Sequence, residues 1–277
     1  MDGVTGLGPG SLPAQSYLLA RLALEWAPAP PILARMRSTV ISVRDGSLPL
    51  GQLGAPLPLE RLVPGGGEWE VELGFGKGRY LLESAARSPE RRFLGVEMVA
   101  KYERMLVRRA RRRGLGNWMS LRGEALYLLS SVLPKGFADV LHVYFPDPWP
   151  KAKHHKRRLF DPETVDLVLG LLKPGGRLCF ATDFLDYGAI VEEILADYPG
   201  LETHRRDEVW PDGARTNYEA KYIEEGRPIL RLEGTLTREP SAPAPLHPAA
   251  AEAILSAQAE SQRGEDLNTL NGRCPGS

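Results

Sequence analysis

The chain has 277 residues, 43% of them hydrophobic, and its 35 basic and 35 acidic residues give a net charge of zero. This length fits one large domain or a domain with appendages, and the charge excludes a protein that is basic throughout. No apolar run approaches the about 20 residues that span a bilayer, and the N-terminus lacks a signal-peptide pattern. Cys179 and Cys274 are too few and too far apart for a disulfide framework or a zinc site. We therefore expect a cytoplasmic protein with no membrane and no metal, either a monomer or a homodimer.

The two ends of the chain differ in amino-acid composition from its middle. Residues 1–67 are rich in Gly and Pro and predict an N-terminal extension that is partly irregular, with a possible strand at Ser38–Val43 and a helical candidate at Tyr17–Trp26. Met36 is a second candidate for the biological start. Residues 238–277 contain SAPAPLHP, an Ala-rich helical piece and a polar end, so we expect a C-terminal extension that is flexible or weakly docked.

Residues 68–237 predict an α/β domain, because apolar runs of strand length alternate with longer helical patterns. The expected strands are 68–75, 92–98, 118–125, 138–145 and 176–183, and the expected helices include 78–88, 101–114 and 161–172. Such alternation indicates a mostly parallel sheet with helices on both faces. A further apolar run, 228–236, predicts a late strand at the edge of the sheet.

The first expected strand runs into a glycine-rich turn, ELGFGKG, which contains Gly74, Gly76 and Gly78. Glycines at a strand-to-helix turn let the backbone approach a ligand closely, and parallel sheets bind ligands at the carboxyl ends of their strands. The next strand ends at Glu97, where a carboxylate can accept hydrogen bonds from both ribose hydroxyls of a nucleoside. The turn therefore predicts a site for a nucleoside cofactor.

The acid that precedes this turn, Glu72, indicates which nucleoside it is. A dinucleotide site requires G-x-G-x-x-G, but Arg79 occupies the position of the third glycine. A carboxylate at the mouth of the turn repels a pyrophosphate and favours a cation such as S-adenosyl-L-methionine, and the pattern resembles the cofactor site of Rossmann-like methyltransferases. A nicotinamide site and a turn without a ligand are the alternatives. Glu124, after the third strand, is either an acceptor for the adenine amine or an ordinary surface glutamate.

A stiff acidic turn adjoins a block of positive charge in FPDPWPKAKHHKRR, residues 145–158. Asp147 follows an apolar run, so we expect it at the end of the fourth strand, and the prolines on both sides restrict the backbone there. Trp149 offers a flat face for a base or a lid over a pocket. The basic block at 151–158 and the Arg-rich segment 101–113 favour a polyanionic substrate such as a nucleic acid. The alternatives are an ordinary Pro-rich loop and solvated charged faces.

Two later polar pieces complete the candidate site. Asp183 follows the fifth strand, and TNYE, Thr216 to Glu219, lies in an expected polar loop before the last strand. Guanine presents two donors on its Watson–Crick edge, and Asp183 and Glu219 are natural acceptors for them. A helix cap or a surface acid is the alternative for each.

The motifs ELGFGKG, FLGVE, FPDPWPKAKHHKRR, TD and TNYE, in this order and spacing, resemble those of the bacterial tRNA (guanine-N7-)-methyltransferases over roughly residues 68–236. The resemblance implies a Rossmann-like S-adenosylmethionine-dependent methyltransferase fold, and transfer of a methyl group to N7 of guanine 46 in the variable loop of tRNA. Glu124 departs from the family pattern, which has Asp or Asn there.

The resemblance also assigns individual residues. The implied cofactor-binding residues are Glu72, Gly74, Gly76, Gly78, Glu97, Glu124 and Asp147, and Asp147 is also the expected catalytic residue. The implied substrate-binding residues are Lys151, Asp183, Thr216, Asn217, Tyr218 and Glu219. The implied RNA contacts are Lys153, His154, His155, Lys156, Arg157 and Arg158.

Three other functions stay open on the sequence. An amino-directed nucleic-acid methyltransferase could use the same D-P-x-W-like turn. A non-enzymatic RNA-binding module could keep a pocket that binds nothing. A dehydrogenase is the third alternative, and Arg79 in place of glycine argues against it.

Overall fold

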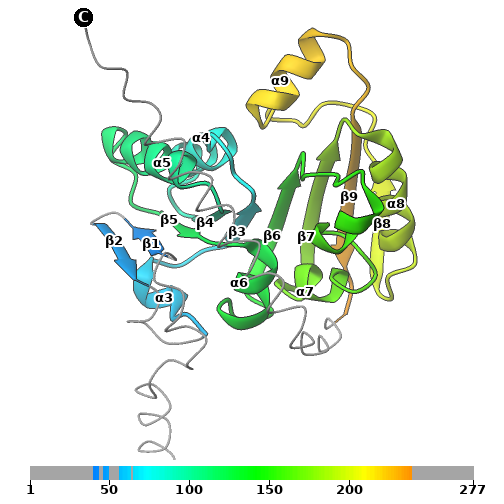
Figure 1. Cartoon of the computed structure of the whole chain (residues 1–277). Helices are drawn as coiled ribbons and strands as arrows, with labels where there is room; N and C mark the ends of the chain where they lie inside the picture. The colour runs from blue at the N-terminus through cyan, green and yellow to red at the C-terminus, as the bar shows by residue number, and fades with distance from the viewer. Residues whose placement is uncertain (1–39, 44–45, 50–55, 64, 239–277) are drawn as a thin grey trace, which may run out of the picture.

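The computed structural model describes residues 40–43, 46–49, 56–63 and 65–238, which form a nine-stranded sheet with helices on both faces (Figure 1). The expected helix at Tyr17–Trp26, the Ala-rich piece of the tail and Met36 lie outside these residues. Across the sheet the strands follow the order β2-β1-β5-β4-β3-β6-β7-β9-β8.

Five neighbouring strands in the middle of this sheet are parallel. They are β3 (Trp69–Leu73), β4 (Arg92–Glu97), β5 (Trp118–Arg122), β6 (Ala138–Tyr144) and β7 (Leu172–Thr182). The strands β3, β4, β5 and β6 are buried along almost their whole length, as expected of strands that are covered on both faces. The strand order reverses between β3 and β6, and open α/β sheets bind their ligands in the crevice at such a point.

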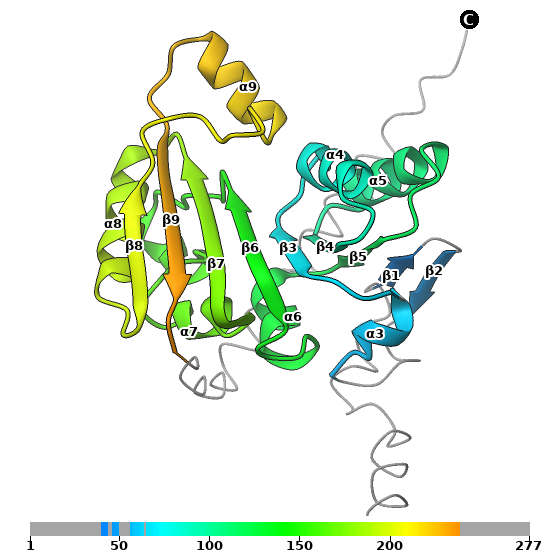
Figure 2. The same ribbon diagram turned by 180° about the vertical axis from the view of Figure 1, so that it is seen from behind.

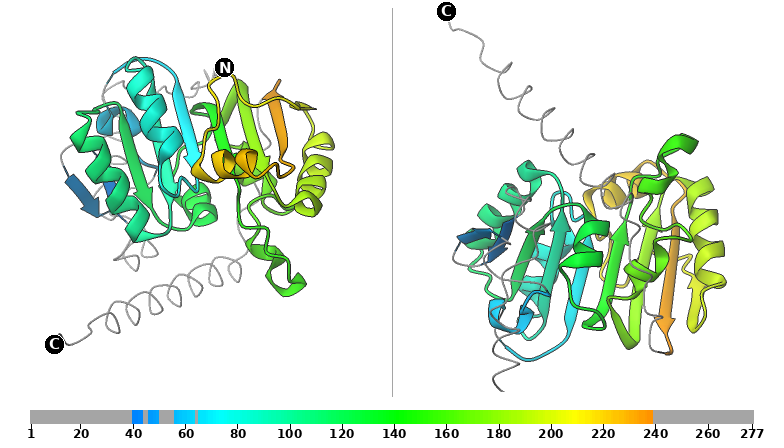
Figure 3. Two further views of the ribbon diagram at one scale, coloured as in Figure 1. Left: turned by 90° about the horizontal axis from the view of Figure 1, so that it is seen from above. Right: turned by 60° about the horizontal axis from the view of Figure 1, so that its bottom comes forward.

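Helices cover the two faces of the sheet unequally. On one face lie α4 (Arg79–Arg87) and α5 (Ala100–Arg112), which bury a core with Phe75, Phe93 and Trp118. The other face carries α6 (Ala125–Ser131), α7 (Val165–Leu169) and α8 (Leu185–Ala196) over the larger apolar core. This arrangement confirms the predicted mostly parallel sheet with helices on both faces, as Figure 3 shows from above and below.

Part of the expected N-terminal extension belongs to this same sheet. Strand β1 (Val40–Val43) pairs antiparallel with β5, and β2 (Gly46–Pro49) pairs with β1. The short helix α3 (Leu59–Leu62) follows, and Leu57 and Leu59 are buried in the larger core. These pieces dock because β5 would otherwise present an open edge.

The last strand, β9 (Leu230–Leu236), is not at the edge that the sequence predicted. It lies antiparallel between β7 and β8 (Leu201–Arg205), so that β8 is the outer strand (Figure 2). The expected polar loop before it contains a helix, α9 (Asn217–Glu224), which lies above the carboxyl ends of β6 and β7 (Figure 1). This segment brings Arg215 next to β6, and β9 brings Arg231 next to α9.

Candidate active site

The glycine turn after β3 forms an open cradle. Gly74, Gly76 and Gly78 all have positive φ, at 75°, 50° and 67°, a backbone conformation that side chains disfavour. A Cβ built on Gly74 or Gly76 would meet nothing within 4 Å, whereas one on Gly78 would lie 2.4 Å from Leu106 of α5. Gly78 is therefore required for helix packing, and the other two leave open space beside the backbone.

Glu72, near the end of β3, is the buried acid at this turn. It is 3% exposed, and its Oε2 has no hydrogen-bond partner among the described residues. Burial raises the pKa of Glu72 to about 8, and the negative charge of nearby Glu97 acts in the same direction. A buried carboxyl oxygen without a partner, two residues before the open glycine turn, is suited to receive a cation.

Glu97 and Asp147 complete a group of three carboxyls with Glu72. The Glu97 oxygens accept hydrogen bonds from the backbone N–H of Gly76, at 2.8 Å, and of Val99, at 2.9 Å. Burial raises the pKa of Glu97, and the charge of Asp147 adds to this effect. The ends of β3 and β4 and the loop after β6 thus bring the three acids into one neighbourhood.

Glu124 caps a helix in this structure. Its Oε2 accepts a hydrogen bond from the backbone N–H of Tyr127, at 2.7 Å, in the first turn of α6. Burial raises the pKa of Glu124. The capping role explains an acid at this position without a ligand, so contact with adenine stays a prediction.

The loop that carries Asp147 is strained and firmly held. Phe145 and Trp149 have φ of 52° and 42°, a conformation that costs about 1–3 kcal/mol for such residues and persists only where the surroundings impose it. The Phe145 N–H donates to Ala181 O at 2.7 Å, and Arg158 Nε donates to Pro148 O at 2.9 Å. Asp147 itself is exposed on this stiff loop.

The basic block forms a short 3-10 helix, Ala152–Arg157. Lys151 and Arg157 are exposed, and His154 and His155 are half-buried, whereas the side chains of Lys153 and Lys156 lie outside the described part of the structure. Arg158 is buried, with its guanidinium 4.9 Å from the Tyr187 ring. Burial and the bond to Pro148 leave little of Arg158 for RNA, so it holds the loop instead.

Glu219 has a different position from the one that the sequence predicted. It is fully buried: Oε2 accepts the N–H of Arg215 at 2.8 Å, and Oε1 accepts Nε of Arg231 on β9 at 2.8 Å. Thr216 Oγ1 accepts the N–H of Glu219 in return, which makes a cap for α9. With both oxygens occupied and no exposure, Glu219 does not offer a carboxylate to a guanine edge.

The other residues of this segment face the Asp147 loop. Tyr218 is 56% exposed, and its ring lies 6.4 Å from that of Phe145, while the Tyr222 ring lies 5.6 Å from Phe145. Burial raises the pKa of Tyr222, and the charge of Asp183 contributes to the shift, so Asp183 lies near this aromatic group. Asn217 is exposed at the first turn of α9. Asp183, Asn217 and Tyr218 are thus groups of this region that a substrate can reach.

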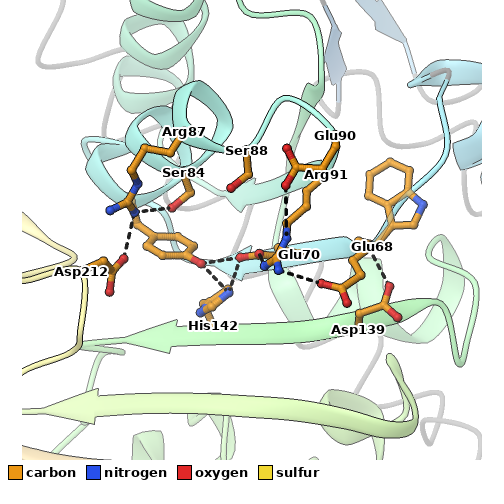
Figure 4. Close-up of polar contacts among 12 residues, drawn as sticks. Glu68, Glu70, Ser84, Arg87, Ser88, Glu90, Arg91, Asp139, His142 and Asp212 are labelled. Carbon is orange, nitrogen blue, oxygen red and sulfur yellow. Dashed lines mark hydrogen bonds and ion pairs between the residues drawn. The ribbon is translucent and has the colours of Figure 1, made fainter.

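A network of buried polar side chains, which the sequence analysis did not predict, joins β3, α4 and β6. His142 Nε2 lies 3.0 Å from Glu70 Oε2, and Tyr80 donates to the same oxygen (Figure 4). Burial opposes ionisation, but His142 and the hydrogen bonds lower the pKa of Glu70 and keep it charged. His142 Nδ1 bonds Tyr144 Oη at 2.8 Å. A Glu and a His inside the apolar strands WEVEL and ADVLHVY are the signal that could have revealed it.

This network reaches the substrate loop through Arg215. Its Nη1 donates to Tyr144 Oη at 2.6 Å, its Nε donates to Asp212 at 2.9 Å, and its guanidinium lies 4.4 Å from the Trp210 ring. The loop before α9 is therefore fixed to β6 immediately ahead of the Asp147 loop.

Neither membrane helices nor metal clusters occur in the part of the chain that the structure describes. None of its helices is long and apolar enough to cross a bilayer. No three His, Cys, Asp or Glu side chains gather there as metal ligands would.

Comparison with known proteins places this site in context. Residues 68–232 match a family model described as a putative methyltransferase, Methyltransf_4. A protein named tRNA (guanine-N(7)-)-methyltransferase from Nitrosococcus oceani is 36% identical over 64% of this chain and 75% of its own length. One of the same name from Alkalilimnicola ehrlichii is 37% identical over 65% of this chain and 77% of its own length.

Among solved structures, one titled as the 16S rRNA methyltransferase KamB matches with a TM-score of 0.54 at 15% identity. It covers 72% of this chain and 100% of its own. At this identity the match supports the fold alone.

Proposed function

The chain belongs to the family of tRNA (guanine-N(7)-)-methyltransferases, and from this premise we propose that it methylates N7 of a guanine in tRNA with S-adenosylmethionine as the donor. The observation that carries the proposal is the unpartnered carboxyl oxygen of Glu72, two residues before the open glycine cradle. Guanine 46 of the variable loop as the target, and a cytoplasmic location, stay predictions.

The residues at the strand ends suit this cofactor. Gly74 and Gly76 leave room for a ligand against the backbone, and Glu72 offers a carboxylate to a cationic group there. Glu97, at the end of β4, would accept the ribose hydroxyls, and the Glu124 region would face the adenine. Asp147 would border the same ligand from the loop after β6.

The main task of the protein in this reaction is to align the methyl donor with the target nitrogen. When bound, S-adenosylmethionine supplies a methyl group on a positively charged sulfur. Guanine N7 has a lone pair and no proton, so it forms the new N–C bond as the S–C bond breaks, without a general base. The positive charge moves from sulfur to the base, where nearby carboxylates such as Asp147 and Asp183 stabilise it. Holding donor and acceptor in line can lower the barrier by several kcal/mol.

The target base must leave its stack to reach the site, which costs a few kcal/mol. Tyr218 and Phe145 offer aromatic faces beside Asp183, and Trp149 lies next to the exposed Arg157, 5.0 Å from its guanidinium. We infer that the aromatic faces receive the base, that Asp183 accepts from its Watson–Crick edge, and that Lys151 and Arg157 contact adjacent phosphates.

Transfer of tritiated methyl groups to bulk tRNA, followed by nucleoside analysis, tests the proposal. We expect N7-methylguanosine, which leaves a borohydride-sensitive site in the RNA. Label in N6-methyladenosine would instead establish the amino-directed alternative. If calorimetry detects no heat with S-adenosylmethionine while the protein still binds tRNA, the chain is a non-enzymatic RNA-binding module.

A further inference from the structure

The outer face of α5 carries an unusual concentration of positive charge. Its exposed cations are Lys101, Arg104, Arg108, Arg109, Arg111 and Arg112, followed by Arg113. The single acid of this helix, Glu103, is buried. Helix α8, at the opposite end of the molecule, bears Asp186, Glu192 and Glu193 and no cation (Figure 1). The zero net charge of the chain thus conceals a strongly basic helix at one end of the molecule.

The arrangement of these arginines is unfavourable for the isolated protein. Arg104 and Arg108, like Arg108 and Arg112, are four residues apart, and like charges at this spacing repel across one helical turn. Among the described residues, the salt bridges are formed by lysines, arginines and histidines outside α5. None of them involves an exposed arginine of α5. The C-terminal helix dipole favours Arg111 and Arg112, but it does not account for Arg104 and Arg108 in the middle of the helix.

Four of these residues surround one hollow on the surface. Arg104, Arg108, Arg111 and Arg112 line it together with Val107 and Glu103. A concave surface lined by guanidinium groups matches the charge and the hydrogen-bonding geometry of phosphodiester oxygens. The helix, about 20 Å long at 1.5 Å per residue, can follow several consecutive phosphates.

Helix α5 is also rigidly connected to the candidate active site. It begins three residues after Glu97, and Leu106 packs against Gly78 of the cradle. Arg109 Nη1 donates to the backbone oxygen of Lys77 in the same turn, at 3.0 Å. An RNA backbone bound by α5 would therefore have a fixed position relative to the methyl donor.

We propose that the outer face of α5 binds the tRNA sugar-phosphate backbone at a place distinct from the target guanine, through Arg104, Arg108, Arg111 and Arg112. This surface is separate from the basic loop at 151–158 and acts with it as a second anchor for the folded RNA. The proposal rests on the proposed function for the identity of the RNA.

The test replaces Arg104 and Arg108, whose side chains form no hydrogen bond or salt bridge with other described residues. The double variant Arg104→Glu/Arg108→Glu is expected to raise the KM for full-length tRNA at least about tenfold. The slope of log Kd against log salt should fall by about two, one for each lost phosphate contact. The affinity for S-adenosylmethionine should not change. The carboxylate that Arg108→Glu introduces would face Arg112 and form a favourable pair that the wild-type helix lacks, although it would also lie four residues from the carboxylate of Arg104→Glu. The variant Arg104→Gln/Arg108→Gln therefore repeats the test without charge reversal.

A matched control reverses two exposed arginines elsewhere, Arg61 on α3 and Arg177 on β7, with the same change in net charge. If the α5 variant and this control shift tRNA binding and its salt slope equally, the effect is one of total charge and the α5 site is refuted. An unchanged slope in the α5 variant refutes it as well. Failure of the proposed function is seen separately, as absence of methyl transfer to tRNA by the wild-type protein.

Discussion

The guanidinium of Arg215 and the phenol of Tyr144 lie 2.6 Å apart, Nη1 to Oη, although 71 residues separate them in the chain. Tyr144 ends β6, and the Asp147 loop starts at the next residue, whereas Arg215 immediately precedes the cap of α9. Together with the ring contacts of Tyr218 and Tyr222 to Phe145, this bond holds in place the two segments that would bind the target base. Both groups are largely buried, so water does not readily replace the bond.

Removal of the Tyr144 hydroxyl should loosen the substrate loop more than the cofactor cradle. Tyr144→Phe leaves Arg215 and His142 each without one partner, so we expect about 1–3 kcal/mol of lost stability. The KM for tRNA should rise while the Kd for S-adenosylmethionine stays close to wild type. Tyr127→Phe is the control, because that buried hydroxyl has no partner among the described residues. Equal losses in the two variants would contradict this role.

The buried pair of Glu219 and Arg231 should govern stability rather than base recognition. Glu219→Ala leaves Arg231 charged and buried, so urea unfolding should show a loss of about 3–5 kcal/mol. Glu225→Ala breaks two exposed ion pairs, with Lys221 and Arg227, and should cost about 1 kcal/mol or less. A Glu219→Ala protein that unfolds like the wild type but no longer binds tRNA would restore the Watson–Crick assignment.

Ionisation of Glu72 should link stability and cofactor binding to pH. Its pKa of about 8 in the folded protein exceeds the ordinary value, 4.5, so the folded state holds more protons between these two pH values. The stability contributed by this group therefore falls as pH rises from 4.5 to about 8. Glu72→Gln removes that dependence and should be more stable than wild type at about pH 9, by a few kcal/mol.

The same variant should lose affinity for the cationic cofactor. Calorimetry of the wild type at about pH 7, in buffers of different ionisation enthalpy, should show proton release on binding, because a cation favours ionised Glu72. Glu83→Gln, the same change at an exposed position of α4, is the control. Binding without proton release, with Glu72→Gln as tight as wild type, would separate Glu72 from the cofactor.

Asp147 and Asp183 should both be needed for turnover, for different reasons. Asp147→Ala and Asp183→Ala should each lower kcat/KM at least about 100-fold, the scale of one lost group that stabilises developing charge. Cofactor affinity should survive better in Asp183→Ala, because Asp147 lies next to Glu97. Asp186→Ala, an exposed acid in the first turn of α8, serves as the control. Wild-type turnover in either variant would refute the assignment.

The sequence alone determined the five parallel strands and the residues at their carboxyl ends. Short apolar runs predicted the strands β3 to β7. A strand that is buried on both faces is recognisable from its own residues, without knowledge of the strands that pair with it. The glycine turn and the acids Glu72, Glu97 and Asp147 followed from the same pattern, since each lies at the end of a parallel strand and such ends share one edge.

Tertiary structure decided which of the polar residues are available to a ligand. The sequence predicts Glu219 as an exposed hydrogen-bond acceptor. In the structure β9 lies between β7 and β8, and its Arg231 forms a buried ion pair with Glu219. Glu70 and His142 meet across 72 residues for the same kind of reason. The partner of a buried charge is chosen by strand order and register, which depend on long-range packing, and local sequence patterns do not encode them.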